Sequence, residues 1–209
     1  MRKIIISSLF ILITIVAYYS IEIVIAHRAT PQIKKEFLSD SRINLKFDEL
    51  SERQQEIFII VQDPNFWNHR GVEFSTPGSG WTTITQSIAK WFYFHPFKPG
   101  IRKIKQTLLA RFVLHNHLSK EEQLLVFINH VWFDEGIRGF RNAANHFYQK
   151  NVDELTEDEF ISLVAMPINP QGFNIFINSE NNKTRSKLIT AMLQGTYQPS
   201  GLFDIYYDR

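Results

Sequence analysis

The chain has 209 residues, of which 44% are apolar and 21% are charged, and its formal net charge is +2. This composition excludes intrinsic disorder, and the small net charge argues against nucleic acid as the main partner. The absence of cysteine excludes disulfide bonds, thiolate metal sites and a cysteine nucleophile. The 18 phenylalanines favour a lipid-contacting surface only weakly, because phenylalanine is first of all a core residue.

The N-terminal segment is expected to anchor the chain in a membrane. Residues 4–26 are almost wholly apolar, with Glu22 as the only charge, and about 20 apolar residues span a bilayer as a helix. We therefore predict an anchor over residues 1–28 and a folded domain over residues 29–209. A cleaved signal peptide is the alternative. No small-residue cleavage site stands out, however, and the tyrosines at 18–19 fit a membrane interface better.

The orientation of the anchor rests on a weaker argument. Basic residues lie on both sides of the apolar run, so the charge difference across it is small. We expect the N-terminus inside, since nothing precedes the run that would need export. The folded domain then lies outside the cytoplasm, and the absence of cysteine agrees with this placement.

The rest of the chain has the signals of a helical domain. Three segments fit the capping-box pattern, in which a Ser or Thr is followed three residues later by Glu or Gln: 51–54, 119–122 and 156–159. Apolar residues recur at helical spacing after the second and third of them. No repeat and no strand-rich stretch is present. The sequence thus predicts a mainly α-helical domain with one core.

The first segment with chemical character covers residues 62–71, Gln-Asp-Pro-Asn-Phe-Trp-Asn-His-Arg-Gly, directly after an apolar run. It concentrates polar, aromatic and glycine residues in a short stretch. Taken alone, a helix end followed by a turn is the simpler interpretation.

The second segment covers residues 78–90. A glycine loop, several threonines and the start of a helix suit an anionic oxygen ligand, because free backbone amides and hydroxyls meet there. Lys90 adds a positive charge one turn along the helix from Gln86. A threonine-rich helix cap is the alternative.

The third segment covers residues 102–106. On a helix, Arg102 and Lys103 lie on the same face as Gln106, and the opposite face is apolar. A solvated basic face is the plain interpretation. Together with the threonine-rich segment, it becomes a candidate cradle for a pyrophosphate.

In this order the segments resemble the motifs of glycosyltransferase family 51, the peptidoglycan glycosyltransferases. The resemblance covers roughly residues 45–195 and is closest to the monofunctional, membrane-anchored members. The family motifs are Glu-Asp-x-x-Phe-x-x-His-x-Gly, Gly-Gly-Ser-Thr-Ile-Thr-Gln-Gln with a following Lys, Arg-Lys-x-Lys-Glu, a motif ending in Tyr-Leu-Asn, and a final glycine- and alanine-containing motif. They match residues 62–71, 80–90, 102–106, 127–129 and 139–144.

The resemblance implies a fold and an activity. The family polymerises lipid II: an acceptor hydroxyl attacks the anomeric carbon of a donor chain, and undecaprenyl pyrophosphate leaves. The implied fold is a lysozyme-like helical domain with a membrane-proximal jaw. Aromatic residues are candidates for the lipid-facing surface of the jaw, with a place in the core as the alternative: Trp91, Phe92, Tyr93, Phe94 and Phe97.

The resemblance also implies roles for individual residues. It places the two catalytic positions at Gln62 and Gln106. It implies substrate and pyrophosphate binding by Thr83, Gln86, Lys90, Arg102, Lys103 and Asn129. It implies structural roles for Asp63, Phe66, His69 and Gly71. For His69, proton transfer is the alternative.

Both catalytic positions depart from the family, which has glutamate where this chain has Gln62 and Gln106. An amide keeps the shape of the carboxylate but cannot accept a proton at ordinary pH. A positioned general base contributes about 10²- to 10⁴-fold in rate. Turnover is therefore expected to be slow unless another carboxylate serves, and Glu73, just after the turn at Gly71, is the best candidate.

Two functions remain open on the sequence alone: a glycosyltransferase, and a pseudoenzyme that binds lipid II or nascent glycan and scaffolds active synthases. A purely structural membrane protein is a third, and it would not need the phosphate-binding residues.

The expected partners are lipid II, nascent peptidoglycan, the membrane and other cell-wall synthases. The family often works better with a divalent cation, but no carboxylate cluster has ligand spacing, so we predict no metal and no cofactor. The expected location is the bacterial inner membrane, as a single-pass protein with its domain on the periplasmic or extracellular side.

Overall fold

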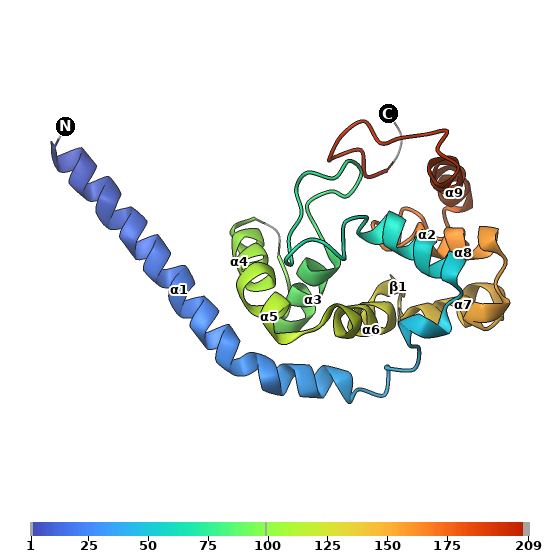
Figure 1. The fold of residues 1–209 in the computed structure, drawn as a ribbon, viewed down its shortest axis with the longest axis horizontal. Coiled ribbons are helices and arrows are strands. Elements are labelled where there is room, and N and C mark those ends of the chain that lie inside the picture. Colours follow the sequence, from blue (N-terminus) through green and yellow to red (C-terminus); the bar gives the residue numbers. More distant parts are fainter. Residues whose placement is uncertain (1, 99, 207–209) are drawn as a thin grey trace.

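The structure is a computed structural model, and it describes residues 2–98 and 100–206 (Figure 1). The prediction of a mainly α-helical domain behind one long apolar helix is confirmed. Its elements, in chain order, are α1 (Arg2–Leu38), the 3₁₀ turn η1 (Phe47–Glu49), α2 (Glu52–Gln62), α3 (Ile84–Tyr93), α4 (Ile101–Leu109), the π-helical turn η2 (Ala110–Leu114), α5 (His115–His117), α6 (Lys120–His130), the strands β1 (Trp132–Asp134) and β2 (Ile137–Arg138), α7 (Phe140–Tyr148), the 3₁₀ turn η3 (Val152–Glu154), α8 (Glu157–Val164) and α9 (Ser179–Leu193).

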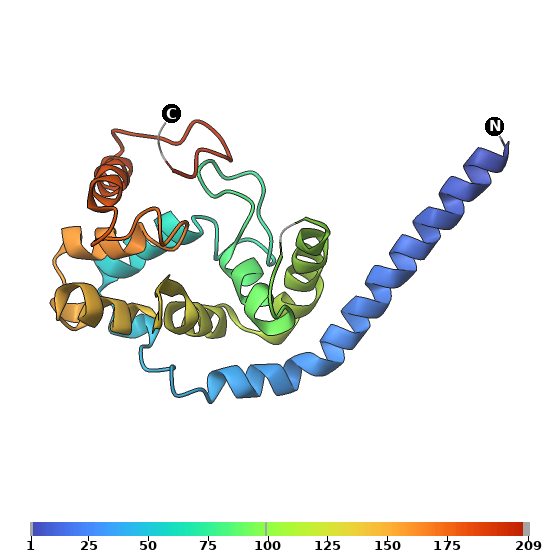
Figure 2. The ribbon, with the colours of Figure 1, turned by 180° about the vertical axis from the view of Figure 1, so that it is seen from behind.

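Helix α1 projects from the domain, as Figures 1 and 2 show. By length and composition it is long and apolar enough to cross a membrane, with a mean hydropathy of 2.3 over its most apolar 18 residues. The helix does not end at residue 28, the predicted end of the anchor, but continues to Leu38. Pro31 lies inside it and removes a backbone hydrogen bond. The helix bends near this point and then passes beneath the domain.

Polar contacts dock α1 onto the domain at three levels. Glu22, the only charge in the apolar run, pairs with Lys105 of α4 at 2.5 Å. Farther along, Thr30 shares a 2.6 Å hydrogen bond with the hydroxyl of Tyr93, and Lys34 pairs with Glu122 at 2.7 Å. These contacts fix the end of α1 against α3, α4 and α6.

The domain has two parts with α6 and the β1–β2 hairpin between them (Figure 1). Helices α3, α4 and α5 form the part next to α1, and helices α2, α7, α8 and α9 form the other. A shared core connects them: the ring of Phe127 on α6 lies 5.8 Å from that of Phe58 on α2 and 5.7 Å from that of Trp91 on α3. The core therefore supports both sides of the space between the two parts.

The aromatic run after Lys90 belongs partly to this core. Phe92 is buried, with its ring 4.4 Å from that of Phe37, whereas Trp91, Tyr93, Phe94 and Phe97 are half-buried. The exposed apolar surface beside α1 comes instead from α4 and η2, where Ile101 is 79%, Ile104 51% and Phe112 49% exposed.

The three predicted capping boxes are confirmed. The N-cap side chains of Ser51, Ser119 and Thr156 each accept a hydrogen bond from the backbone N–H three residues later. These bonds satisfy backbone donors that a helix start leaves free. They define where α2, α6 and α8 begin.

Gly71 marks a close approach between the first motif and η2. Its φ is +89°, and a Cβ at this position would lie 2.4 Å from the carbonyl oxygen of Ala110. The glycine at 136, in the turn between β1 and β2, has a φ of +74° but no atom within 4 Å of such a Cβ. A side chain at position 71 would therefore cause both backbone strain and steric overlap, whereas one at position 136 would cause backbone strain alone.

We predict that Gly71→Ala lowers the free energy of unfolding by about 2–5 kcal/mol, because left-handed strain and overlap with Ala110 add together. Gly136→Ala, the matched control, should cost only about 1–2 kcal/mol, from strain alone. Urea unfolding of the full-length protein in a neutral detergent measures both. Equal losses in the two variants would contradict the close approach.

Candidate active-site cleft

The first motif is organised around Asp63, which is buried at the end of α2. Its carboxylate accepts hydrogen bonds from Nε2 of His69 at 2.9 and 3.0 Å, and from the backbone N–H of Ile84 at 3.0 Å. Nδ1 of His69 accepts from the N–H of Gly71 at 3.0 Å, so the ring proton is on Nε2. Asp63 thus ties the end of α2 to the turn at residues 69–71 and to the start of α3.

Phe66 contributes to the same scaffold. Its ring is fully buried, and Nζ of Lys120 lies 4.1 Å from the ring centre. The same ammonium group donates a hydrogen bond to the carbonyl of Phe66. Burial lowers the pKa of Lys120 to about 8. These contacts connect α6 with the first motif.

Thr83 and Gln86 form a fourth capping box, at the start of α3. The hydroxyl of Thr83 accepts from the N–H of Gln86 and donates to the carbonyl of Gly71 at 2.8 Å. The side chain of Gln86 is fully buried; it accepts from the N–H of Thr83 at 3.0 Å and donates to Thr107 at 2.9 Å. Thr83 and Gln86 therefore act as a helix cap in the structure, which was the alternative to an anion site on the sequence alone.

Asn129 holds the chain beyond α1, and its backbone lies against Gly139 of the fifth motif. Its amide oxygen accepts from the backbone N–H groups of Asn44 and Leu45, both at 3.0 Å. Its amide nitrogen donates to the carbonyls of Leu45 and Leu125, at 2.7 and 2.8 Å. All its hydrogen-bonding capacity is thereby used inside the protein.

The third motif divides between two environments. Arg102 is exposed in the first turn of α4 and donates to the carbonyl of Pro96 at 2.8 Å. Gln106 is fully buried and donates to the carbonyl of Gln86 at 2.5 Å, while its Oε1 is buried without a partner. The two side chains lie one turn apart on α4, as helical spacing predicts, but Arg102 faces solvent whereas Gln106 is buried.

A cavity of about 300 Å³ lies between the two parts of the domain. Gln62, at the end of α2, reaches it and donates to the carbonyl of Val164 at 2.8 Å. Polar and charged groups on its wall come from four regions of the chain: Gln62, Ser79, Thr82, Ser87, Lys90 and Arg185. The structure thus brings Gln62 and Lys90 together, and Nζ of Lys103 joins them by donating to Thr82 at 2.8 Å.

The cavity is cationic. Burial lowers the pKa of Lys90, and burial followed by repulsion from Lys90 lowers the pKa of Lys103 to about 8. Arg185 adds a further charge and donates to the carbonyls of Ala165 and Ile205. None of the described residues that line the cavity is an aspartate or a glutamate. The wall suits an anion, and its described residues offer no carboxylate to take up a proton.

Glu73 does not line this cavity. Its Oε1 accepts from the hydroxyl and the N–H of Ser75, both at 2.6 Å, and from the N–H of Phe74 at 2.8 Å. Its Oε2 accepts from Asn65 at 2.6 Å. These hydrogen bonds, with Ser75 first, lower the pKa of Glu73 to about 2. A carboxylate held in this way is a weak base, and it stabilises the loop instead.

Sequence reasoning missed the contribution of the C-terminal region. The carbonyls of Gly201 and Leu202 accept from Gly78 and Gly80, both at 2.9 Å. Farther along, Ile205 lines the cavity, together with Arg185 of α9. No local signal marks these residues, because they reach the cleft only through tertiary packing.

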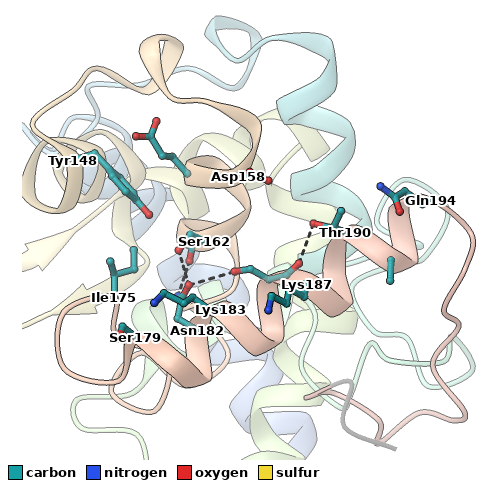
Figure 3. Close-up of a pocket in the computed structure, with 13 residues that line it drawn as sticks. Tyr148, Asp158, Ser162, Ile175, Ser179, Asn182, Lys183, Lys187, Thr190 and Gln194 are labelled. Carbon is teal, nitrogen blue, oxygen red and sulfur yellow. Dashed lines mark hydrogen bonds between the residues drawn. The ribbon is translucent and has the colours of Figure 1, made fainter.

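A larger cavity, of about 570 Å³, lies between α8 and α9 and contains none of the motif residues (Figure 3). Its polar groups bond to one another: Asn182 accepts from Ser162 at 2.5 Å and donates back to the carbonyl of Ser162 at 2.9 Å. Metal ligands are also missing, since within residues 2–98 and 100–206 no three His, Asp or Glu side chains are grouped to hold an ion. The expected absence of a metal stays a prediction.

The sequence model of the transglycosylase family matches residues 30–194. The chain belongs to the transglycosylase family. The match covers most of the chain and includes all five motif segments. The resemblance to glycosyltransferase family 51 is thereby confirmed.

Three curated proteins illustrate what this transglycosylase domain is similar to. Penicillin-binding protein 1F of Bacillus subtilis (strain 168) is 27% identical over 168 residues, which cover 74% of this chain and 23% of that protein. Penicillin-binding protein 1A of Neisseria gonorrhoeae is 31% identical over 157 residues, or 69% of this chain and 20% of that protein. Its counterpart in Neisseria cinerea is 32% identical with the same coverage. The chain thus spans about a fifth to a quarter of the length of these relatives.

Lys103 gives the cleft a measurable pH dependence. We predict that the affinity for inorganic pyrophosphate falls about tenfold from pH 7 to pH 9.5, because Lys103, with its pKa lowered to about 8, loses the proton that it donates to the anion. In Lys103→Arg the charge persists over this range, so the fall should be much smaller.

Isothermal titration calorimetry on the two proteins side by side measures this difference. The titration of pyrophosphate itself is common to both and cancels in the comparison. The same pH dependence in parent and variant would contradict a role for Lys103.

Proposed function

We propose that this chain is a membrane-anchored, peptidoglycan glycosyltransferase-like protein that binds lipid II through its pyrophosphate, with greatly impaired glycan polymerisation. The observation that carries this proposal is the composition of the cleft cavity. Lys90 and Arg185 line it, Lys103 lies beside it, and no described lining residue has a carboxylate. Binding groups for an anion are thus present where a proton acceptor is missing.

The chemistry of glycosyl transfer explains why this composition matters. When the acceptor hydroxyl attacks the anomeric carbon, its proton has to be taken up, and the amide of Gln62 cannot do this. Cations near a leaving pyrophosphate stabilise its developing charge, and this contribution remains. Loss of the base alone lowers the rate by about 10²- to 10⁴-fold.

The alternative is a glycosyltransferase with a replacement base. Glu73 was the best candidate on sequence, but it accepts four hydrogen bonds, has a pKa of about 2 and lies outside the cavity wall. The geometry therefore favours precursor binding over turnover. A pseudoenzyme of this kind would hold lipid II or nascent glycan and scaffold active cell-wall synthases.

The proposed location is supported by α1 and its contacts. The apolar part of α1 is exposed, and Glu22 and Thr30 connect its last turns to the domain. We place α1 across the bacterial inner membrane as a single span, with the domain on the periplasmic or extracellular side. The cleft then lies near the membrane that carries lipid-linked precursors.

A gel assay with labelled lipid II and the full-length protein, beside Gln62→Ala, tests the proposal. We expect no polymer from the parent, while lipid II stays on the protein in a pull-down. Polymer from the parent but not from Gln62→Ala would overturn the loss of turnover. Absence of both polymer and retained lipid II would overturn precursor binding.

A carboxylate at position 62 should restore glycan polymerisation. In Gln62→Glu, the new carboxylate faces the carbonyl of Val164, to which the amide now donates at 2.8 Å. This repulsion raises the pKa of the carboxylate while Lys90 and Arg185 on the same wall lower it, so the group is ionised at neutral pH and can accept a proton. We predict a gain in polymerisation rate of about 10²-fold or more over the parent.

Gln106→Glu is the matched control for the second amide. Gln106 is fully buried and donates to the carbonyl of Gln86, so a glutamate there must stay protonated to keep this bond. Alone it should destabilise the fold at neutral pH and give no gain in rate. No gain from Gln62→Glu, with lipid II retention unchanged, would show that more than the base has been lost.

A further inference from the structure

A second cavity, of about 420 Å³, shares Lys90 and Trp91 with the cleft cavity but is otherwise lined by different residues. Its wall combines aromatic rings with basic side chains from four segments: Phe37, Arg42, Phe94, Phe97, His130 and Arg138. No described lining residue is acidic. None of Arg42, His130 and Arg138 belongs to the residues assigned to precursor binding.

The charge of this cavity favours an anion. Arg42, Lys90 and Arg138 are its cations, and Asp40, just outside the wall, pairs with Arg42 at 2.5 Å. Three cations against one carboxylate leave an excess of two positive charges. Arginine side chains are suited to phosphate groups, because their planar N–H donors match the oxygens in pairs.

His130 supplies a polar group that the protein itself leaves unused. It is only 2% exposed, its ring lies 4.9 Å from that of Phe37, and its Nε2 has no hydrogen-bond partner. Burial lowers the pKa of His130 to about 4, so the ring is neutral at pH 7, and a hydrogen bond to the Phe37 backbone engages its other nitrogen. Nε2 is then an acceptor, and it suits a hydroxyl group. Buried polar atoms without partners are rare and call for an explanation.

The cavity lies at the level where α1 leaves its apolar stretch. Phe94, on the cavity wall, packs against a small buried cluster that includes Ala26 of α1. The neighbouring Tyr93 bonds to Thr30. If α1 spans the membrane, this level is that of the lipid head groups, where aromatic and basic side chains concentrate.

We propose that this cavity binds the head group of an anionic phospholipid that carries free hydroxyls. The phosphodiester lies between Arg42 and Arg138, and the start of the acyl chains lies along Phe94 and Phe97. Nε2 of His130, which is closed off from solvent in the structure, is uncovered as the lipid enters and accepts from a head-group hydroxyl. The inference rests on the proposed membrane anchoring through α1, but it does not depend on turnover or on lipid II. It makes the attachment of the domain to the bilayer sensitive to lipid composition.

Short-chain lipids test the proposal on the full-length protein in a neutral detergent, by isothermal titration calorimetry. The probes are dihexanoyl phosphatidylglycerol, dihexanoyl phosphatidylcholine and inorganic phosphate. We expect the phosphatidylglycerol to bind at least about tenfold more tightly than either of the others, because only it offers a net charge, hydroxyls and acyl chains together.

Arg138→Gln is the informative variant. Arg138 donates only a long, 3.3 Å hydrogen bond to the carbonyl of His130, so we expect the fold to be retained, and a melting temperature checks this. Phosphatidylglycerol affinity should fall about 10- to 100-fold. Arg28→Gln removes an equal charge, from α1 and away from the cavity wall, and it should change affinity by no more than about twofold.

Three outcomes would overturn part or all of this proposal. Equal binding of the two lipids, or equal losses in Arg138→Gln and Arg28→Gln, would overturn a specific site. Inorganic phosphate binding as tightly as the lipid would overturn the lipid assignment. A lipid II pull-down on the same samples separates this inference from the proposed function: if the parent fails to retain lipid II but binds phosphatidylglycerol selectively, the precursor proposal fails and the head-group site stands.

Discussion

The cleft depends on one buried carboxylate. Asp63 accepts hydrogen bonds from His69 at the turn after α2 and from the first backbone N–H of α3. The turn itself approaches η2 so closely that only glycine fits at position 71. Because these bonds connect the two parts of the domain, the position of Gln62 relative to Lys90 follows from them. The polar motif residues Asp63 and His69 therefore hold the elements around the cleft in position.

The motif residues divide into those that build the cleft and those that face a ligand. Thr83, Gln86 and Asn129 use their hydrogen-bonding groups within the protein, whereas Gln62, Lys90 and Lys103 lie at or beside the cavity. The chain keeps these building residues and cations, whereas Gln62 and Gln106 replace the two family glutamates, and Trp81 and Ser87 also depart from the second motif.

Much of the fold was predictable from local patterns. Capping boxes and apolar spacing identified α2, α6 and α8, and the apolar run identified α1. Tertiary contacts were not predictable in the same way. Helical spacing placed Arg102 and Gln106 on one face, but Arg102 lies in the first turn of α4 and turns back to Pro96. Arg185 reaches the cleft from α9, and no local pattern encodes a contact over such a separation.

Precursor binding and glycan polymerisation can be separated in one experiment. In a single-turnover experiment with the full-length protein in excess over labelled lipid II, bound and polymerised lipid are counted in the same samples. We predict that most of the lipid II is bound and that polymer forms at least about 10²-fold more slowly than on a family member with glutamate at the position of Gln62. Polymer formation at the rate of that relative would contradict it.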